Sequence, residues 1–419
     1  MLESDEAARR LGVKVTTLYA YVSRGLLTSH RAPSGRRSLF AADDVERLAR
    51  HSRQGKTVET RMATVTTGVT QLTDEGPVYG GRRATDLALG ATFEEVALRL
   101  WAGPDAAGTE PEPDERPEPG AWEALDLGPP PEVSASDRMR WVVVMAGARD
   151  RLRADLRRQV VTAKAARVAA SMVDALTRPG PAATARPEVA LVLPEGRERP
   201  GALAARLTAR LSPEPDPPLV RMVNAALVLM ADHELATSTM AVRVAASTRA
   251  DLYDVLLAGL GTIAGPLHGG ASQQVTTLLD GARRHGVERA VNDSLRWQGV
   301  LPGFGHSVYK HGDARCTMLL ALFEQSAPPE DVELVRDLVR LAADHDIPPP
   351  NVDLALASMA WATGMPPDAG RTLFTVARVA GWTAHYLEEL EERPLRYRAR
   401  AVYATPGRSG VAGPRSVPS

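Results

Sequence analysis

Apolar residues recur at helical spacing along most of the chain, and this pattern predicts a largely helical protein. Between residues 134 and 176 they return every three or four positions, and residues 219–392 continue in the same way apart from glycine-rich stretches. Aromatic residues make up only 5% of the 419 positions, so Ala, Leu and Val must fill the core. Small side chains favour closely packed helices over a sheet sandwich, and we expect an all-α fold.

Other patterns interrupt the helical one. Turn formers and alternating residues in 57–81 predict short strands or irregular structure. Residues 104–133 are rich in proline and acid, and we expect a surface insertion or linker with little fixed structure. Two shorter proline-rich breaks cover 179–189 and 212–218, and residues 407–419 are expected to form a flexible tail.

The first 55 residues form a unit of their own. Two short helical patterns separated by Gly12 are followed by LLTSHRAPSGRRSLF, a hairpin pattern, and by a third helical pattern, AADDVERLAR. This order predicts a helix-turn-helix with a wing. Residues 1–56 hold eleven Lys and Arg against six Asp and Glu, a net charge of +5, although the whole chain carries −1.

This unit resembles the MerR-type winged helix over its whole length. In that family the second helix enters the major groove of DNA and the wing lies on phosphates. The pattern leaves another use open, because small helix-turn-helix units also serve in protein docking. The residues that the resemblance places on DNA are Lys14, Thr16, Thr17 and Tyr19 of the second helix, and Arg36 and Arg37 of the wing.

Composition excludes several classes of protein. The one cysteine, Cys316, rules out a disulfide framework and a cysteine-rich metal site. No apolar run reaches membrane-spanning length, since the best of them, AALVLMA, stops at Asp232. The charged opening MLESDEAARRLG lacks the apolar segment of a signal peptide. We therefore expect a soluble cytoplasmic protein without a membrane partner.

Four short stretches of the body place a histidine or an aspartate beside acids, glycine or proline. They are ADHELATST with His233, GPLHGGAS with His268, PGFGHSVYKHGDAR with His306 and Arg315, and PPPNVD with Asp353. Taken singly, each has an ordinary explanation as a capped helix end, a turn or a first-turn carboxylate. Together they can form an acid–base site for a polycarboxylate, with an aspartate base, histidine donors and arginine clamps.

In this order and spacing, the four stretches resemble the citrate synthase family from about Thr57 to Pro406. The match includes TGVTQLTDEGPVYGG near the start and VARVAGWTAHYLEE near the end. A metal site fits less well, because the histidines lie far apart and no local pair anchors them. The resemblance implies a helical body over 56–406, a small domain at roughly 270–370 that closes over the substrates, and a homodimer.

The resemblance also assigns roles in the condensation of acetyl-CoA or propionyl-CoA with oxaloacetate and water, which gives citrate or 2-methylcitrate and CoA. His268 would donate to the thioester carbonyl, Asp353 would remove the methyl proton, and His306 would polarise and protonate the ketone. Oxaloacetate would be held by His233, Arg315 and Arg378, and by Arg398 lent from the neighbouring subunit. No cofactor is permanently bound; CoA, as co-substrate, would lie along Leu301, Pro302, Gly303, Phe304 and Gly305.

Some positions depart from the family pattern. Ser272, Ser307 and Ala314 stand where the family often has Asn, Arg and Pro, and Leu354 replaces an aromatic residue. No catalytic group is removed, but a roomier pocket would accept propionyl-CoA, since one methylene changes discrimination by only ~1–3 kcal/mol. A second hypothesis is a DNA-binding regulator that uses the body as a sensor for oxaloacetate, citrate or an acyl-CoA. The intact Asp353 favours the enzyme, because sensing needs no base.

Overall fold

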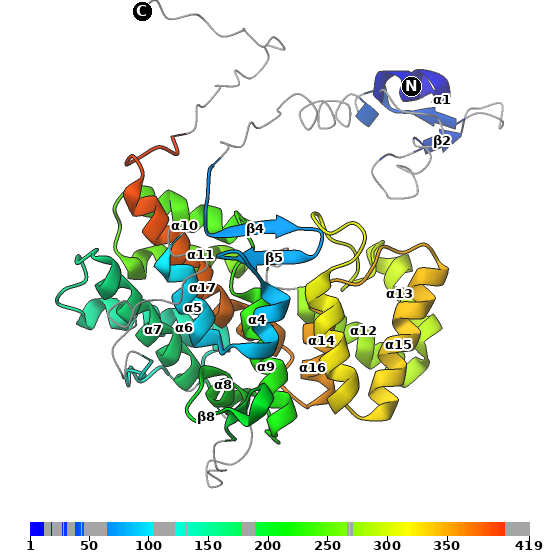
Figure 1. The fold of residues 1–419 in the computed structure, drawn as a ribbon. Coiled ribbons are helices and arrows are strands. Elements are labelled where there is room, and N and C mark those ends of the chain that lie inside the picture. The colour runs from blue at the N-terminus through cyan, green and yellow to red at the C-terminus, as the bar shows by residue number, and fades with distance from the viewer. Residues whose placement is uncertain are drawn as a thin grey trace, which may run out of the picture. The chain divides into compact units, whose positions relative to one another are not determined.

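The computed structural model describes residues 1–11, 18, 27, 29–31, 38–42, 44–45, 65–103, 122–130, 132–177, 189–265, 268 and 271–398. The chain divides into two compact units, Met1–Thr66 and Thr67–Ser419, and each has a hydrophobic core of its own. Helices make up nearly all the regular structure of the larger unit (Figure 1), which confirms the all-α prediction. The boundary expected at residue 55 stays a prediction, because residues 51–64 lie outside the described part.

The small unit packs a helix against a three-stranded antiparallel sheet. Its elements are β1 (Leu2–Glu3), α1 (Ser4–Leu11), β2 (Ser29–Arg31) and β3 (Ser38–Phe40), with strand order β1-β3-β2. Ser29 pairs with Phe40, so the predicted hairpin is confirmed, whereas the strand at Leu2–Glu3 was not apparent from the pattern. The residues predicted to contact DNA, Lys14, Thr16, Thr17, Tyr19, Arg36 and Arg37, lie outside the described residues.

The large unit begins with a short antiparallel sheet, as the pattern of residues 57–81 predicts. Strands β4 (Thr70–Thr73), β5 (Gly76–Tyr79) and β6 (Arg82–Arg83) lie in sequence order. Helices α4 (Ala84–Gly90) and α5 (Phe93–Ala102) follow. Helix α5 starts where it does because Thr92 and Glu95 form a reciprocal capping box: Thr92 Oγ1 accepts from the Glu95 amide at 3.1 Å, and Glu95 Oε2 accepts from the Thr92 amide at 2.8 Å.

The expectation of little fixed structure throughout 104–133 was wrong for residues 122–130. The Trp122 ring stacks on Trp101, with centroids 5.8 Å apart, and Leu127 is buried in the main core. The Leu127 carbonyl also accepts a hydrogen bond from Trp141 Nε1 at 3.0 Å. The apolar residues of this segment outweigh its prolines and acids, because they find partners on distant helices that the local pattern does not reveal.

The helices of the body surround two largely buried ones. In α17 (Ala369–Glu391), 18 of 23 residues are buried, and in α9 (Pro217–Met230), 11 of 14, so both helices are covered over most of their surface. The proline-rich break at 212–218 connects the preceding helix to the start of α9, where Asp216 caps the helix by accepting from the Leu219 amide at 2.8 Å. Around them pack α6 (Ala135–Arg149), α7 (Arg158–Asp174), α8 (Leu203–Leu211), α10 (Thr237–Ser247) and α11 (Leu252–Ile263), with a hairpin of β7 (Leu191–Val192) and β8 (Glu198–Arg199).

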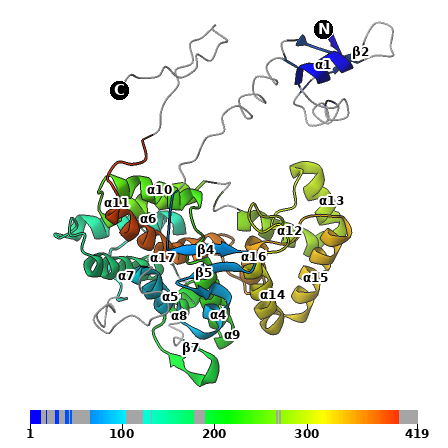
Figure 2. The ribbon, with the colours of Figure 1, turned by 45° about the horizontal axis from the view of Figure 1, so that its top comes forward.

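A second group of helices follows α11 in the chain. It consists of α12 (Ala271–His285), α13 (Val287–Gln298), α14 (Ala314–Ser326), α15 (Pro329–Asp344) and α16 (Val352–Ala362). Figures 1 and 2 show this group gathered on one side of the large unit, where α14 packs on α9 and both α12 and α16 pack on α17. The small domain predicted at roughly 270–370 spans these helices; its separate closure stays a prediction.

In the described part of the chain, no helix combines the length and the apolar character needed to cross a membrane.

Candidate active site

His233 lies in a tight turn directly after α9. Its Nε2 is 3.0 Å from the hydroxyl of Tyr309, so the ring is anchored across the boundary between the two helix groups. Burial, together with the charges of Arg315 and Arg378, lowers the pKa of His233 to about 2. The imidazole is therefore neutral at physiological pH and acts as a hydrogen-bonding group rather than as a cation.

His306 stands beside His233 and has one nitrogen already occupied. The ring centroids of the two histidines are 5.5 Å apart, and the His306 ring stacks on Tyr309 at 4.8 Å. His306 Nδ1 accepts from the backbone amides of Val308 and Tyr309 at 3.0 and 3.2 Å. Burial and the Arg315 charge lower the pKa of His306. A neutral ring that accepts at Nδ1 carries its proton on Nε2, so His306 offers an N–H donor.

His268 approaches the same region from the turn before α12. Its Nε2 is 2.9 Å from the hydroxyl of Ser238 at the start of α10. Its ring meets the edge of Phe374, with centroids 5.8 Å apart. Burial first, and the charge of Arg378 second, lower the pKa of His268, so this imidazole is also favoured in its neutral form.

Arg315 is buried at the start of α14 and is held by the residue that caps this helix. Its Nε and Nη2 donate to the two carboxylate oxygens of Asp313 at 2.9 and 2.8 Å. Asp313 also accepts from the backbone amide of Val352 at 3.2 Å, which ties α14 to the start of α16. The bidentate pair fixes the guanidinium plane. Its Nη1 is left facing Met230 Sδ at 3.9 Å, a weak acceptor that a carboxylate would replace.

Arg378 reaches the same methionine from the middle of α17. Its Nε donates to the carbonyl of Met230 at 3.2 Å, and its guanidinium lies over the Phe374 ring, 4.6 Å from the centroid. The side chain is 1% exposed, yet Nη1 has no acceptor among the described residues. An unmatched buried N–H of a guanidinium costs free energy, and an anionic ligand would remove that cost.

Asp353 lies in the first turn of α16. Asn351 caps this helix, and its Oδ1 accepts from the Asp353 amide at 3.0 Å. Burial raises the pKa of Asp353 to about 6, with Asp313 adding to the increase and Arg315 opposing it. A carboxylate with this pKa is a stronger base than an ordinary aspartate and is still ionised at neutral pH.

The loop predicted to bind CoA joins His306 to Asp353. The Asn351 amide donates to the Gly303 carbonyl at 2.8 Å, and Asn351 Nδ2 donates to the Gly305 carbonyl at 2.8 Å. Gly303 has φ +83°, and a Cβ there would lie 2.9 Å from Val275 Cγ2. Only glycine fits this tight passage. The loop residues are Leu301, Pro302, Gly303, Phe304 and Gly305, and three of their backbone groups are engaged with 349–351.

Six of the seven catalytic and oxaloacetate-binding predictions meet in one cluster, linked by the contacts and charge effects above: His233, His268, His306, Arg315, Asp353 and Arg378. Arg398 is exposed after the end of α17. Our sequence reasoning missed Tyr309, Asp313 and Phe374, which orient these residues. Tyr309 and Asp313 lie within the quoted stretch around His306, so the signal was their spacing from it. Phe374 precedes Arg378 by one helical turn.

Among the described residues, no group of three or more His, Cys, Asp or Glu side chains is arranged to hold a metal ion.

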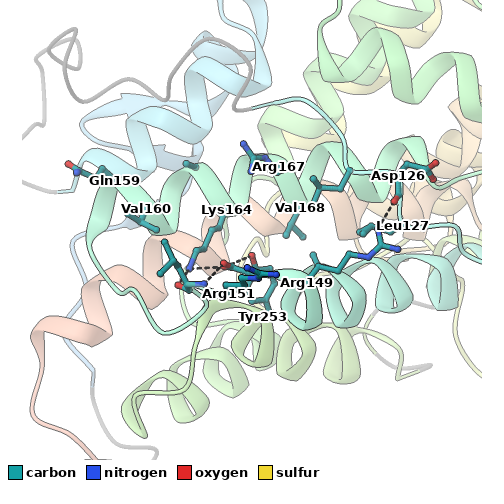
Figure 3. A pocket seen from close by; sticks show the side chains of 15 residues that line it. Asp126, Leu127, Arg149, Arg151, Gln159, Val160, Lys164, Arg167, Val168 and Tyr253 are labelled. Atoms are coloured by element: carbon teal, nitrogen blue, oxygen red, sulfur yellow. Dashed lines mark hydrogen bonds and ion pairs between the residues drawn. The ribbon is translucent and has the colours of Figure 1, made fainter.

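A separate hollow of about 660 Å³ lies between α6, α7 and the segment 122–130 (Figure 3). Its lining includes Val160, Val168 and Tyr253, and Lys164 pairs there with Asp150 at 2.9 Å. None of the predicted site residues lines this hollow.

Comparisons with known proteins match both units. The family described as citrate synthase, C-terminal domain, matches residues 59–400, and a helix-turn-helix domain matches residues 1–53. Citrate synthase 2 of Bacillus subtilis is 29% identical over 358 residues, 81% of this chain and 93% of that protein. 2-Methylcitrate synthase 2 of Corynebacterium glutamicum is 36% identical over 189 residues, 44% of this chain and 49% of that protein. Citrate synthase of Thermoplasma acidophilum, solved in a ternary complex with carboxymethyl coenzyme A and oxaloacetate, is 25% identical, with a TM-score of 0.65 over 84% of this chain and 96% of that chain.

Proposed function

Because this chain belongs to the citrate synthase family, we propose that it condenses an acyl-CoA thioester with oxaloacetate and releases CoA. The observation that carries the proposal is Asp353, a carboxylate with a pKa raised to about 6 near Arg315. A group with this pKa suits the removal of a proton from carbon at neutral pH. A protein that only sensed these ligands would have no use for it.

The chemistry follows from the state of each group. Asp353 takes a proton from the carbon next to the thioester carbonyl, while His268 donates to that carbonyl oxygen as it gains charge. The resulting enol carbon attacks the ketone carbon of oxaloacetate and forms the new C–C bond. His306 Nε2–H, left free by the backbone bonds at Nδ1, supplies the proton for the ketone oxygen. Water then cleaves the thioester, giving the carboxylate product and CoA.

Two buried arginines supply the binding site for oxaloacetate. Arg378 Nη1 lacks an acceptor among the described residues, and Arg315 Nη1 faces only a methionine sulfur. Each would donate to a substrate carboxylate, with neutral His233 as a further partner. The pre-fixed guanidinium of Arg315 binds with little loss of side-chain entropy, because Asp313 already holds it.

We further propose that the protein works as a homodimer in which Arg398 completes the neighbouring site. Arg398 is exposed, in agreement with a residue that acts outside its own subunit. Large apolar side chains are exposed on α6 and α10, where Trp141, Val144 and Val244 are 38%, 49% and 43% accessible. Association with a second copy would remove exposed apolar side chains of these helices from water.

Two acyl-CoA substrates, acetyl-CoA and propionyl-CoA, are compatible with this site. Relatives named for citrate and for 2-methylcitrate synthesis both match this chain. Leu354, where the family often has an aromatic residue, is fully buried against Gly303 beneath the CoA loop. We propose that this smaller side chain leaves room for propionyl-CoA besides acetyl-CoA.

We also propose that the N-terminal unit binds DNA. Its support is the helix-turn-helix match over residues 1–53 and the net charge of +5 over 1–56. The test is a mobility shift of genomic fragments at low and high salt. Binding that weakens with salt and is lost in the Arg36→Ala/Arg37→Ala variant supports it, and no shift even at low salt excludes it. No finding favours the regulator hypothesis without catalysis.

The experiment that tests the enzyme is release of free thiol from acetyl-CoA or propionyl-CoA in the presence of oxaloacetate. We expect release by the wild type and a drop in kcat of about 10²–10⁴-fold in Asp353→Asn. Oxaloacetate binding, measured by calorimetry, should persist in that variant. A folded wild-type protein that binds oxaloacetate but releases no thiol with either substrate would refute the proposal.

A further inference from the structure

We propose that His385 and Arg243 form a positioning relay that couples the turn presenting His233 to the segment presenting Arg398. The relay consists of Asp232, His385, Arg243, Glu389 and Arg396. Its inner four members are 0% exposed. The inference rests on the proposed function, because it concerns the placement of two residues proposed to bind oxaloacetate.

The first link holds the turn around His233. Asp232 Oδ2 accepts from the Glu234 amide at 3.0 Å, and His385 Nε2 lies 3.3 Å from the same oxygen. Glu234 has φ 52°, a left-handed conformation that a non-glycine residue adopts at a cost. The turn persists because Asp232 stabilises it, and the position of Asp232 depends in turn on His385.

The second link fixes the tautomer of His385. Arg243 Nη1 lies 2.9 Å from His385 Nδ1, and a guanidinium can only donate. His385 Nδ1 must therefore accept, which places the ring proton on Nε2 and makes it the donor to Asp232. One neutral ring thus joins a buried cation to a buried anion, and each depends on the orientation of that ring.

The third link extends from Arg243 to the end of the described chain. Arg243 Nε donates to Glu389 Oε2 at 3.0 Å. Glu389 also accepts two bonds from Arg396, at 2.8 and 2.6 Å, and one from the Tyr397 hydroxyl at 2.9 Å. Arg396 and Tyr397 directly precede Arg398, so the relay holds the backbone from which Arg398 projects.

Stability alone gives little reason for such an arrangement. Buried ion pairs are often no more stabilising than apolar side chains of the same volume, because desolvation offsets their attraction. What the relay supplies is geometry, since every member is fixed by at least two polar contacts in which direction matters. Loss of His385 would remove one of the contacts that hold Asp232 and let the turn at Glu234 relax, which would move His233.

The first test uses three variants of neighbouring residues on α17. In His385→Leu we expect oxaloacetate affinity, measured by calorimetry, to fall about tenfold or more, with KM for the acyl-CoA within about twofold of wild type. His385→Gln should recover most of this loss, because an amide can both accept and donate. Tyr386→Phe, which removes the hydrogen bond from the tyrosine hydroxyl to the Ala250 carbonyl, is the control and should leave oxaloacetate affinity unchanged. Equal affinity in the Leu, Gln and wild-type proteins, or equal losses in Leu and Phe variants, would overturn the proposal.

The second test addresses the outer end, where a variant is less disruptive to folding. Arg396→Gln breaks the contact with Glu389, and we expect oxaloacetate affinity to fall about fivefold or more. Arg393→Gln removes the same charge three residues away, where no described residue offers a partner, and should change nothing. Equal behaviour of the two variants would overturn the proposal. Because both tests read oxaloacetate binding, a protein that binds oxaloacetate but shows no thiol release refutes the proposed function and leaves the relay to be judged on its own.

Discussion

At the scale of single residues, the site depends on burial that sets protonation. The pKa values of three histidines are lowered and that of one carboxyl group is raised, and the largest cause in each case is removal from water. The pKa of Asp353, raised to about 6, places the titration of this carboxyl just below neutral pH. The protonation state of Asp353 therefore affects both the rate of the reaction and the stability of the fold.

Asp353 should make both activity and stability depend on pH. Its pKa of about 6 in the folded protein exceeds the value of about 3.9 for an unfolded aspartate. The protonated form is thus favoured by folding, and stability from this group is present below about pH 4 and lost as pH rises through 6. We expect kcat to fall below about pH 6, because the base becomes protonated. At pH 8 the free energy of unfolding of Asp353→Asn should exceed that of the wild type by up to about 3 kcal/mol. At pH 4 the two proteins should be equally stable. Denaturant melts at the two pH values check this, and an equal difference at both would contradict it.

Arg378 should tolerate no other cation. Arg378→Lys keeps the charge but loses the planar donors that contact Met230 and the proposed substrate carboxylate. We expect KM for oxaloacetate to rise by about 10–100-fold, with KM for the acyl-CoA nearly unchanged. Arg221→Lys on an exposed position of α9 is the matched control and should behave as wild type. Steady-state kinetics of the two variants test this. Similar KM values for oxaloacetate in both would argue against a role of Arg378 in binding the substrate carboxylate.

At the scale of elements, α17 holds the site together because it can lie very close to the turn after α9. The Gly381 amide donates to the Ala231 carbonyl at 3.0 Å. A Cβ on Gly381 would lie 2.6 Å from that oxygen, inside van der Waals contact. The glycine is therefore required by close approach of two backbones, although its own φ is not positive.

Gly381→Ala should move the turn that carries His233. We expect a loss of about 1–3 kcal/mol in unfolding free energy, as for overpacked cores, together with weaker oxaloacetate binding. Gly261→Ala in α11 is the control, since a Cβ there meets nothing within 4 Å. It should be neutral or stabilising by up to about 1 kcal/mol. Thermal melts and calorimetry test this, and a Gly381 variant as stable as the Gly261 variant would show that the turn can adapt.

At the scale of the whole molecule, the small and the large unit have separate cores. We therefore expect each unit to unfold with a free energy of its own. The small unit depends on a few buried side chains, among them Ala7, Leu18 and Phe40. The large unit has an extensive core that includes none of them. Small units are the less stable ones, because a smaller fraction of their surface is buried.

Phe40→Ala should unfold the small unit and spare the large one. Removing a fully buried phenylalanine costs about 3–5 kcal/mol, comparable to the whole stability of a unit of this size. We expect scanning calorimetry to lose a minor transition while thiol release stays within about twofold of wild type. Arg9→Ala, at an exposed position, is the control and should keep both transitions. A parallel loss of thiol release would show that the two units depend on each other.

The sequence by itself determined the helical class, the wing hairpin and the set of histidines, arginines and aspartate that meet in the site. These are local signals, because helical periodicity and short motifs are legible within one stretch of chain. Only the tertiary structure decided which groups each of them touches. Arg378 donates to Met230 across 148 positions, and His385 joins Asp232 across 153. Contacts with Trp101 of α5 and Trp141 of α6 also bring residues 122–130 into the core, against their composition. Contacts of this kind depend on how distant helices pack, and no local pattern encodes that.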